Sequence, residues 1–200
     1  MFDEPFRARF QRLVDPLVHA LDRAGATPNQ ITVVTFIVAI TAAAIVAAGH
    51  PLVGIVVWLF SRIGDGLDGA LARAASAATP FGAFLDITLD MAAYAAMVLG
   101  FAHIHPELPV AWAAVLFGYV MVITTTLALS DAAGVIGRRV SDTDRTFQFT
   151  PGLTEAGETN VMYVLWAIFP NHVPWLVWVW VAALVATAIQ RTHLAWRVLR

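Results

Sequence analysis

The chain has 200 residues, of which 59% are hydrophobic and 13% charged, and its mean hydropathy is +0.72. Soluble globular chains carry about 25% charged residues, so this composition excludes a disordered chain, a collagen-like repeat and a cytosolic enzyme. The net charge of −2 argues against nucleic acid as a partner. Because cysteine is absent, the chain has no disulfide and no thiolate metal site. These numbers predict a multi-pass membrane protein.

Six segments approach or reach the length of about 20 mainly apolar residues that a helix needs to cross a bilayer. Proline and glycine residues that stop helices separate them. The predicted spans are Ile31–Gly49, Pro51–Ala72, Gly82–Ile104, Leu108–Leu129, Thr154–Phe169 and Pro174–Ile189. The predicted fold is therefore an all-α integral membrane protein with one domain, residues 1–200. It has a core of six transmembrane helices at 26–190 and a cytoplasmic tail at 191–200.

The arginines support this topology. All twelve basic residues are arginines, and none lies in the connections that follow the first, third and fifth spans. They are Arg7, Arg9, Arg12, Arg23, Arg62, Arg73, Arg138, Arg139, Arg145, Arg191, Arg197 and Arg200. By the positive-inside rule, both termini and the polar halves of the helices face the cytoplasm.

The segment before the first span, residues 1–25, has phenylalanine and leucine at helical spacing and arginine on the other faces. This pattern predicts an amphipathic helix in the membrane interface, which Pro16 divides. A soluble helix that packs on the cytoplasmic end of the bundle is an equally good interpretation.

Four aspartates lie at the cytoplasmic ends of the second and third spans. Asp65 and Asp68 are three residues apart, and Asp86 and Asp90 are four apart, so each pair shares one helix face. The short loop between the spans makes the helices antiparallel neighbours. The four carboxylates are therefore expected to converge in one polar pocket.

Each ionised group inside a bilayer segment costs about 2.5–3.5 kcal/mol, and Arg62 and Arg73 are too few to neutralise four carboxylates. Ligands that are all hard oxygens favour Mg²⁺ or Mn²⁺ over zinc. Four aspartates suit two metal ions that hold a phosphate between them. Two other interpretations stay open: the aspartates cap helices or face water, or they line the path of a divalent-cation carrier or channel.

The pattern around these aspartates resembles a known motif. It runs Asp65-x-x-Asp68-Gly69-x-x-Ala72-Arg73, then eight residues, then Gly82-x-x-x-Asp86-x-x-x-Asp90. Every position is similar to the motif of the CDP-alcohol phosphatidyltransferase family (class I). Thr27-Pro28-Asn29-x-x-Thr32 also resembles that family's N-terminal element. The stretch 151–159 is similar to one bacterial branch of the family that is found in the inner membrane.

The resemblance implies that a CDP-linked donor, usually CDP-diacylglycerol, gives its phosphatidyl group to the hydroxyl of a small polar alcohol and releases CMP. It implies that Asp65, Asp68, Asp86 and Asp90 bind metal and that Asp90 is also the catalytic base. The implied nucleotide contacts are Gly69, Ala72, Arg73, Gly82, Asn29 and Thr32. Membrane lipid is the other expected partner, and a homodimer is an expectation because dimers are common in the family.

The acceptor pocket is expected beside Asp90, bordered by the fourth and fifth spans. The candidate contacts are Arg138, Arg139, Arg145, Glu155 and Glu158. Arginines would hold a phosphorylated acceptor, whereas the two glutamates suit an acceptor with hydroxyl or amine groups. Alternatively, the arginines only set the topology, and the glutamates only pair with them and hold the fifth span in place.

Overall fold

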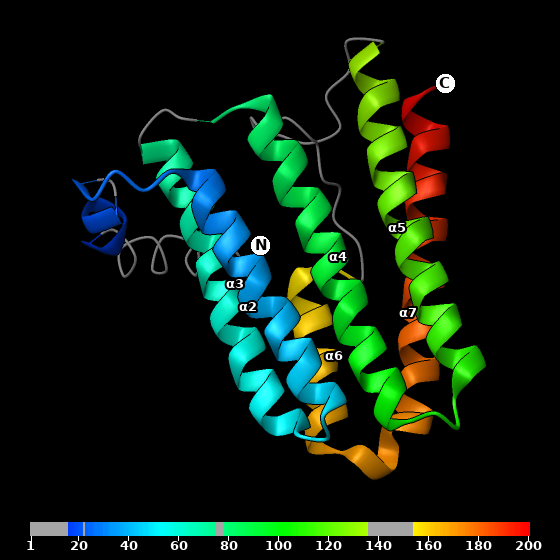
Figure 1. Cartoon of the computed structure of the whole chain (residues 1–200). Helices are drawn as coiled ribbons and strands as arrows, with labels where there is room; N and C mark the ends of the chain where they lie inside the picture. The colour runs from blue at the N-terminus through cyan, green and yellow to red at the C-terminus, as the bar shows by residue number, and fades with distance from the viewer. Residues whose placement is uncertain (1–15, 22, 75–77, 136–153) are drawn as a thin grey trace.

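The computed structural model describes residues 16–21, 23–74, 78–135 and 154–200 (Figure 1). Its main elements are α2 (Pro28–Ala47), α3 (Pro51–Ala74), α4 (Pro80–Ile104), α5 (Pro109–Val135), α6 (Ala156–Ile168), the 3₁₀ turn η1 (Pro170–His172) and α7 (Val173–Val198). Each of the first four helices begins at a proline, whose fixed φ and missing N–H suit the first helical position.

Capping side chains set the starts of α2 and α4. Thr27 accepts a hydrogen bond from the backbone N–H of Gln30 at 3.3 Å, and the side chain of Gln30 accepts one from Thr27 N–H at 3.0 Å. Thr79 accepts from Gly82 N–H at 3.0 Å at the start of α4. Gly49, at φ +87°, turns the chain between α2 and α3. This tight turn makes the two helices antiparallel neighbours.

The helices form two groups, which are connected by α6 and by direct packing of α4 against α5. Helix α2 packs against α3 and α4, α5 packs against α7, and α6 lies between the groups against α3 and α7 (Figure 1). A Cβ on Gly100 would lie 2.7 Å from the carbonyl oxygen of Ala43, so the backbones of α4 and α2 nearly touch. Close approach at small residues is how helices associate in membranes.

Buried aromatic rings fill the centre of the bundle. Trp58 and Tyr163 are fully buried, with ring centroids 5.5 Å apart, and Phe101 and Trp166 join the same cluster. The Tyr163 hydroxyl donates to the backbone oxygen of Tyr94 at 2.9 Å. The hydroxyls of Tyr163 and Tyr119 are 3.0 Å apart. The core is therefore held by packing and by hydrogen bonds between helices.

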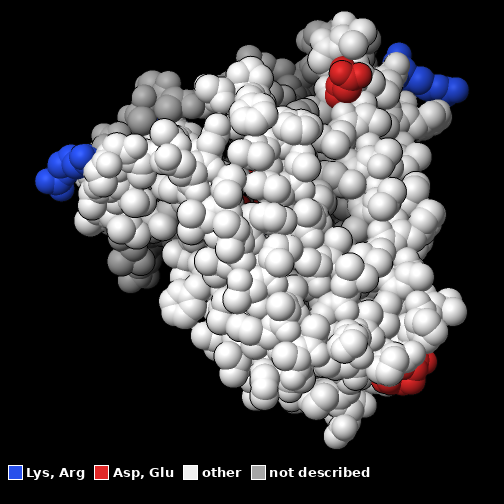
Figure 2. Space-filling view, viewed as in Figure 1, with Lys and Arg blue, Asp and Glu red and all other residues white. Residues whose placement is uncertain are grey.

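Four of the described helical stretches are long and apolar enough to cross a membrane: α2, α4, α5 and the stretch 170–198. Figure 2 shows that most of the charged side chains in view lie at the periphery of this face, and only a small acidic area is visible near its middle. Helix α3 carries charges in its second half. Helix α6, with 13 residues, is only about 20 Å long. The all-helical fold class is confirmed, and the count of six transmembrane helices stays a prediction.

The structure adds detail at both ends of the chain. Helix α7 continues to Val198, so the predicted boundary at residue 190 falls inside a helix, and Arg191 is 6% exposed. The sequence offers no helix breaker there: the drop in hydropathy does not end the helix. At the other end, residues 16–21 are helical and Val18 is buried against Leu67 and Leu71. The remainder of the predicted interfacial helix, residues 1–15, lies outside the described residues.

Candidate active site

The aspartates lie where the second half of α3 faces the first half of α4. Carboxylate oxygens of Asp65, Asp68 and Asp86 all lie within 4.8 Å of one another. Asp68 is buried, Asp65 is half-buried and Asp86 is exposed. Burial decreases across the cluster, so a ligand can enter from the side of Asp86. The structure thus brings together three of the four predicted carboxylates.

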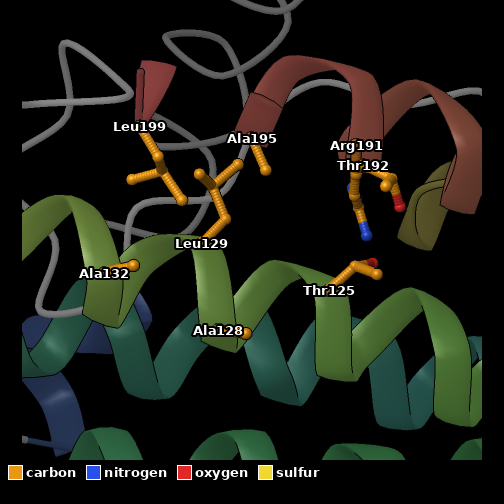
Figure 3. Close-up of a pocket in the computed structure, with 8 residues that line it drawn as sticks. All are labelled: Thr125, Ala128, Leu129, Ala132, Arg191, Thr192, Ala195 and Leu199. Carbon is orange, nitrogen blue, oxygen red and sulfur yellow. The ribbon is translucent and has the colours of Figure 1, made fainter. Parts of the chain in front are cut away.

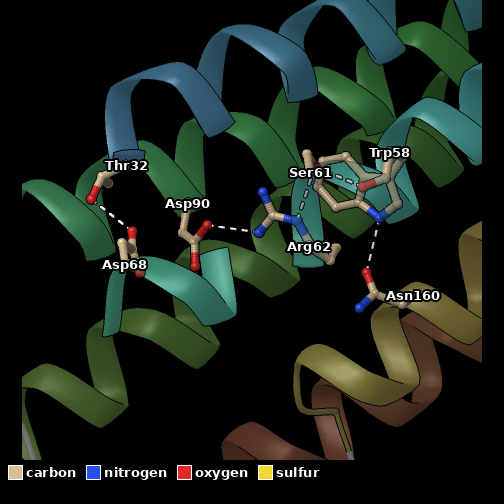
Figure 4. A network of polar contacts seen from close by, with 7 residues as sticks. All are labelled: Thr32, Trp58, Ser61, Arg62, Asp68, Asp90 and Asn160. Carbon is tan, nitrogen blue, oxygen red and sulfur yellow. Dashed lines mark hydrogen bonds and ion pairs between the residues drawn. The ribbon is translucent and has the colours of Figure 1, made fainter. Parts of the chain in front are cut away.

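The fourth carboxylate, Asp90, lies beside this cluster and is paired with Arg62. Nη1 of Arg62 donates to Oδ1 of Asp90 at 2.7 Å, and the two side chains are 10% and 25% exposed (Figure 4). Asp90 also interacts electrostatically with Asp65 and Asp68. The site therefore consists of a three-carboxylate cluster and an adjacent ion pair.

Arg62 is a site residue that the sequence analysis did not assign. Its guanidinium carbon lies 4.4 Å from the ring centroid of Trp58 and 5.4 Å from that of Tyr94. The available signal was its position three residues before Asp65, which places it on the same face of α3. Only the packing of α4 on that face pairs it with Asp90.

Thr32 joins α2 to the cluster. Its Oγ1 donates to Oδ2 of Asp68 at 2.6 Å and lies 3.1 Å from the carbonyl oxygen of Pro28, one turn earlier (Figure 4). Thr32 was predicted to contact the nucleotide. In the structure its hydroxyl orients a carboxylate of the cluster, and a nucleotide contact stays a prediction.

The other predicted nucleotide residues surround the same end of the bundle. A Cβ on Gly82 would lie 3.0 Å from Oδ1 of Asn29, so the Asn29 amide lies over the first turn of α4. A Cβ on Gly69 would lie 3.3 Å from Nη1 of Arg73, so that guanidinium folds back along α3. Ala72 is partly buried on the same helix. The glycines leave room for these polar groups close to the backbone.

The predicted acceptor residues are placed only in part. Arg138, Arg139 and Arg145 lie outside the described residues. Glu155 and Glu158 are at the start of α6, where a side-chain oxygen of Glu158 accepts from the backbone N–H of Glu155 at 3.0 Å. This is a helix-capping contact, which agrees with a structural role for Glu158, and an acceptor contact stays a prediction.

Two further polar contacts attach α6 and the residues just before it to their neighbours. Nε1 of Trp58 donates to Oδ1 of Asn160 at 2.9 Å (Figure 4). Oγ1 of Thr154 donates to Oγ1 of Thr187 at 2.9 Å. Because Trp58 also stacks on Arg62, the start of α6 is connected to the ion pair of the site by two direct contacts.

Arg191 is the other buried cation of the described residues near this end of the bundle. It donates to the carbonyl oxygen of Val122 at 3.0 Å and to Oγ1 of Thr126 at 2.5 Å. It lies at a groove of about 320 Å³ between α5 and α7 (Figure 3). Arg191 follows the last apolar run of the sequence, which is why it is predicted to lie in a cytoplasmic tail.

The chain is similar to known proteins over most of its length. The chain is 36% identical to the inner membrane protein YnjF of Escherichia coli (strain K12), over 85% of this chain and 83% of the relative. It is 34% identical to a phosphatidylinositol phosphate synthase of Mycobacteroides abscessus, over 94% and 85% of the two chains.

Two crystal structures of the phosphatidylinositol phosphate synthase of Mycobacterium tuberculosis have the same fold. The complex with manganese and citrate is 24% identical with a TM-score of 0.74, over 90% of this chain and 88% of that chain. The form with CDP-DAG bound is 23% identical with a TM-score of 0.71, over 92% and 94%. The family model described as CDP-alcohol phosphatidyltransferase matches residues 26–189. On this match, and on the relatives above, the chain belongs to the CDP-alcohol phosphatidyltransferase family.

Proposed function

We propose that this chain transfers a phosphatidyl group from CDP-diacylglycerol to the hydroxyl of a small polar alcohol and releases CMP. The observation that carries the proposal is the cluster of three carboxylates with the ion-paired Asp90 beside it. Family membership supports the reaction class. The solved relative with CDP-DAG bound supports the donor.

The carboxylates are suited to hold divalent metal. All the donors are hard oxygens, and three of them lie within 4.8 Å of one another, which fits Mg²⁺ or Mn²⁺. Asp65, Asp68 and Asp86 would hold the ions, and Asp90 would complete the predicted two-metal set. When bound, the ions would neutralise the diphosphate of the donor and stabilise CMP as it leaves. Manganese in the solved relative supports this assignment.

Asp90 is the proposed general base. As the acceptor oxygen bonds to the phosphorus of the phosphatidyl group, the phosphorus–oxygen bond to CMP breaks, and the hydroxyl proton moves to the carboxylate of Asp90. A carboxylate does this if it reaches the hydroxyl in the bound complex. Holding the base and both substrates together supplies much of the acceleration.

The nucleotide would lie across the ends of α2, α3 and α4. Gly69 and Gly82 allow its close approach, Arg73 would face the diphosphate, and Asn29 would contact the nucleoside. Ala72 and Thr32 would line the same side of the nucleotide site. A site at the membrane surface lets the acyl chains of the donor stay in lipid while CDP and the acceptor come from water.

The topology is part of the proposal. Six spans with both termini in the cytoplasm would place the cluster at the cytoplasmic face of the inner membrane. The four apolar helices support a multi-pass membrane protein, and the distribution of the arginines supports this orientation. A carrier or channel for divalent cations has no specific support. Such a path would continue beyond the cluster between α3 and α4, but there the buried side chains of Trp58, Met97 and Phe101 belong to the apolar core.

The test is acceptor-dependent CMP release by the purified protein in detergent with CDP-diacylglycerol and Mg²⁺ or Mn²⁺. The acceptor panel is glycerol 3-phosphate, inositol phosphate, serine, glycerol and inositol. One acceptor is expected to raise CMP release well above the rate without acceptor. Absence of both CMP release and metal-dependent binding of CDP-diacylglycerol would refute the proposal.

Two variants make the assay specific for the site. Asp90→Asn should abolish transfer in a protein that still folds, because the amide cannot take the proton. Glu107→Gln is the matched control, since this exposed acid lies in the loop at the opposite end of the bundle and should keep the parental rate. Retained turnover in Asp90→Asn would overturn its assignment as the base.

A further inference from the structure

Arg62 lies between the carboxylates and the aromatic core, and the mechanism above gives it no role. Its side chain is 10% exposed and its Nη1 holds Oδ1 of Asp90 at 2.7 Å. An arginine keeps its proton at any ordinary pH. The pair therefore places a permanent cation next to the proposed base.

The guanidinium of Arg62 is held from several sides. Its central carbon lies 4.4 Å from the centroid of Trp58 and 5.4 Å from that of Tyr94, within the range of cation–π attraction. Its Nε donates to Oγ of Ser61 at 3.3 Å, and that hydroxyl donates to the carbonyl oxygen of Trp58 at 2.7 Å. These contacts keep the fork in one orientation.

Trp58, the aromatic side chain that packs against the guanidinium of Arg62, is itself held in place. Trp58 is fully buried, and its Nε1 donates to Asn160 on α6 at 2.9 Å. The position of the guanidinium therefore does not depend on the ion pair, and Asp90 is the partner with more freedom, being 25% exposed. Because the guanidinium of Arg62 is held in place, its hydrogen bond to Oδ1 of Asp90 also fixes the direction in which Oδ2 of the same carboxylate points.

We infer that Arg62 is a positioning residue for the proposed transfer: it holds Oδ1 of Asp90 so that Oδ2 is presented to the acceptor hydroxyl. The inference rests on the proposed function. Arg62 stays on Asp90 throughout the reaction and does not help to hold the metal. Removing it should slow the chemical step, because a misplaced base loses most of its effect, and should not weaken metal binding.

The experiment compares Arg62→Met, which keeps the length and removes the charge, with Arg62→Lys and with Arg197→Met as control. Arg197 is exposed in the last turn of α7. The measurements are kcat and the donor KM with the best acceptor of the panel, and Mn²⁺ affinity by calorimetry. Arg62→Met should lower kcat about 100-fold with the donor KM within about threefold of the parent. Arg62→Lys should recover part of the rate.

A second background shows whether Arg62 acts through Asp90. In Asp90→Glu the longer side chain displaces the carboxylate from the guanidinium of Arg62. Adding Arg62→Met to this variant should therefore lower kcat by less than about tenfold. If Arg62 had only a structural role, Arg62→Met would lower kcat by the same factor in the parent and in Asp90→Glu. Equal factors, or a parental rate in Arg62→Met, would overturn the inference.

Metal binding keeps this test separate from that of the proposed function. Mn²⁺ should bind Arg62→Met at least as tightly as the parent, because a positive charge has left the neighbourhood of the carboxylates. Affinity about tenfold weaker would show that Arg62 organises the metal ligands and would overturn the inference. If the parent releases no CMP with any acceptor, the proposed function fails and the inference fails with it, whereas a slow Arg62→Met beside an active parent concerns Arg62 alone.

Discussion

The hydrogen bond from Thr32 to Asp68 gives Thr32 a second role, orienting a metal ligand, beside the predicted contact to the nucleotide. Its Oγ1 lies 2.6 Å from Oδ2 of Asp68, and both side chains are buried. Thr32→Val keeps the branched shape and removes the hydroxyl. Hydrogen bonds to a charged group contribute about 1.5–3 kcal/mol. Partners that orient metal ligands change metal affinity about 10- to 100-fold, a range of about 1.4–2.7 kcal/mol.

We expect Thr32→Val to weaken Mn²⁺ binding by about 10- to 100-fold, and saturating metal should restore most of the rate with the donor KM unchanged. Calorimetry with Mn²⁺, and CMP release at increasing metal concentration, measure the two effects. Thr41→Val is the matched control, since Thr41 lies on the same helix and its hydroxyl bonds only within that helix, to Ile37 at 2.8 Å. A raised donor KM with normal metal affinity would refute the reasoning and assign Thr32 to the nucleotide.

Three further outcomes are expected. Removal of metal by EDTA should abolish CMP release, and added Mg²⁺ or Mn²⁺ should restore it; activity that survives chelation would contradict the metal assignment. Gly100→Ala should lower the thermal unfolding temperature in detergent, at a cost of about 1–3 kcal/mol, because its Cβ would lie 2.7 Å from Ala43 O. Gly134→Ala, which meets nothing within 4 Å, should be neutral or stabilising by up to about 1 kcal/mol. Asn160→Leu should lower the free energy of unfolding by about 1–3 kcal/mol, because it leaves Nε1 of Trp58 without its acceptor. An unchanged unfolding temperature would show that this hydrogen bond does not stabilise the fold.

The sequence was sufficient for most helix positions, because prolines begin four helices and apolar runs of membrane length fill three of them, α2, α4 and α5. It located the apolar part of α7 and carried no signal for the helix end at Val198, since hydropathy reports where a helix leaves an apolar environment and not where its backbone hydrogen bonds stop. It also could not decide how the N-terminal segment is used. In the described part, Val18 packs on Leu67 and Leu71 of α3, a contact between segments that are far apart in the chain.

In the candidate site, too, some features follow from the sequence and others only from the packing of the helices. Spacing along a single helix put Asp65 with Asp68 and Asp86 with Asp90, because helical periodicity is a local property. The choice of partners across helices depended on how α2, α3 and α4 pack. That packing groups Asp86 with Asp65 and Asp68, pairs Asp90 with Arg62, and brings the hydroxyl of Thr32 to Asp68. Thus the sequence by itself determined which carboxylates are candidates for the chemistry, and only the tertiary structure decided which of them touch and that Arg62 joins them, because distances between helices depend on side-chain contacts that no local pattern encodes.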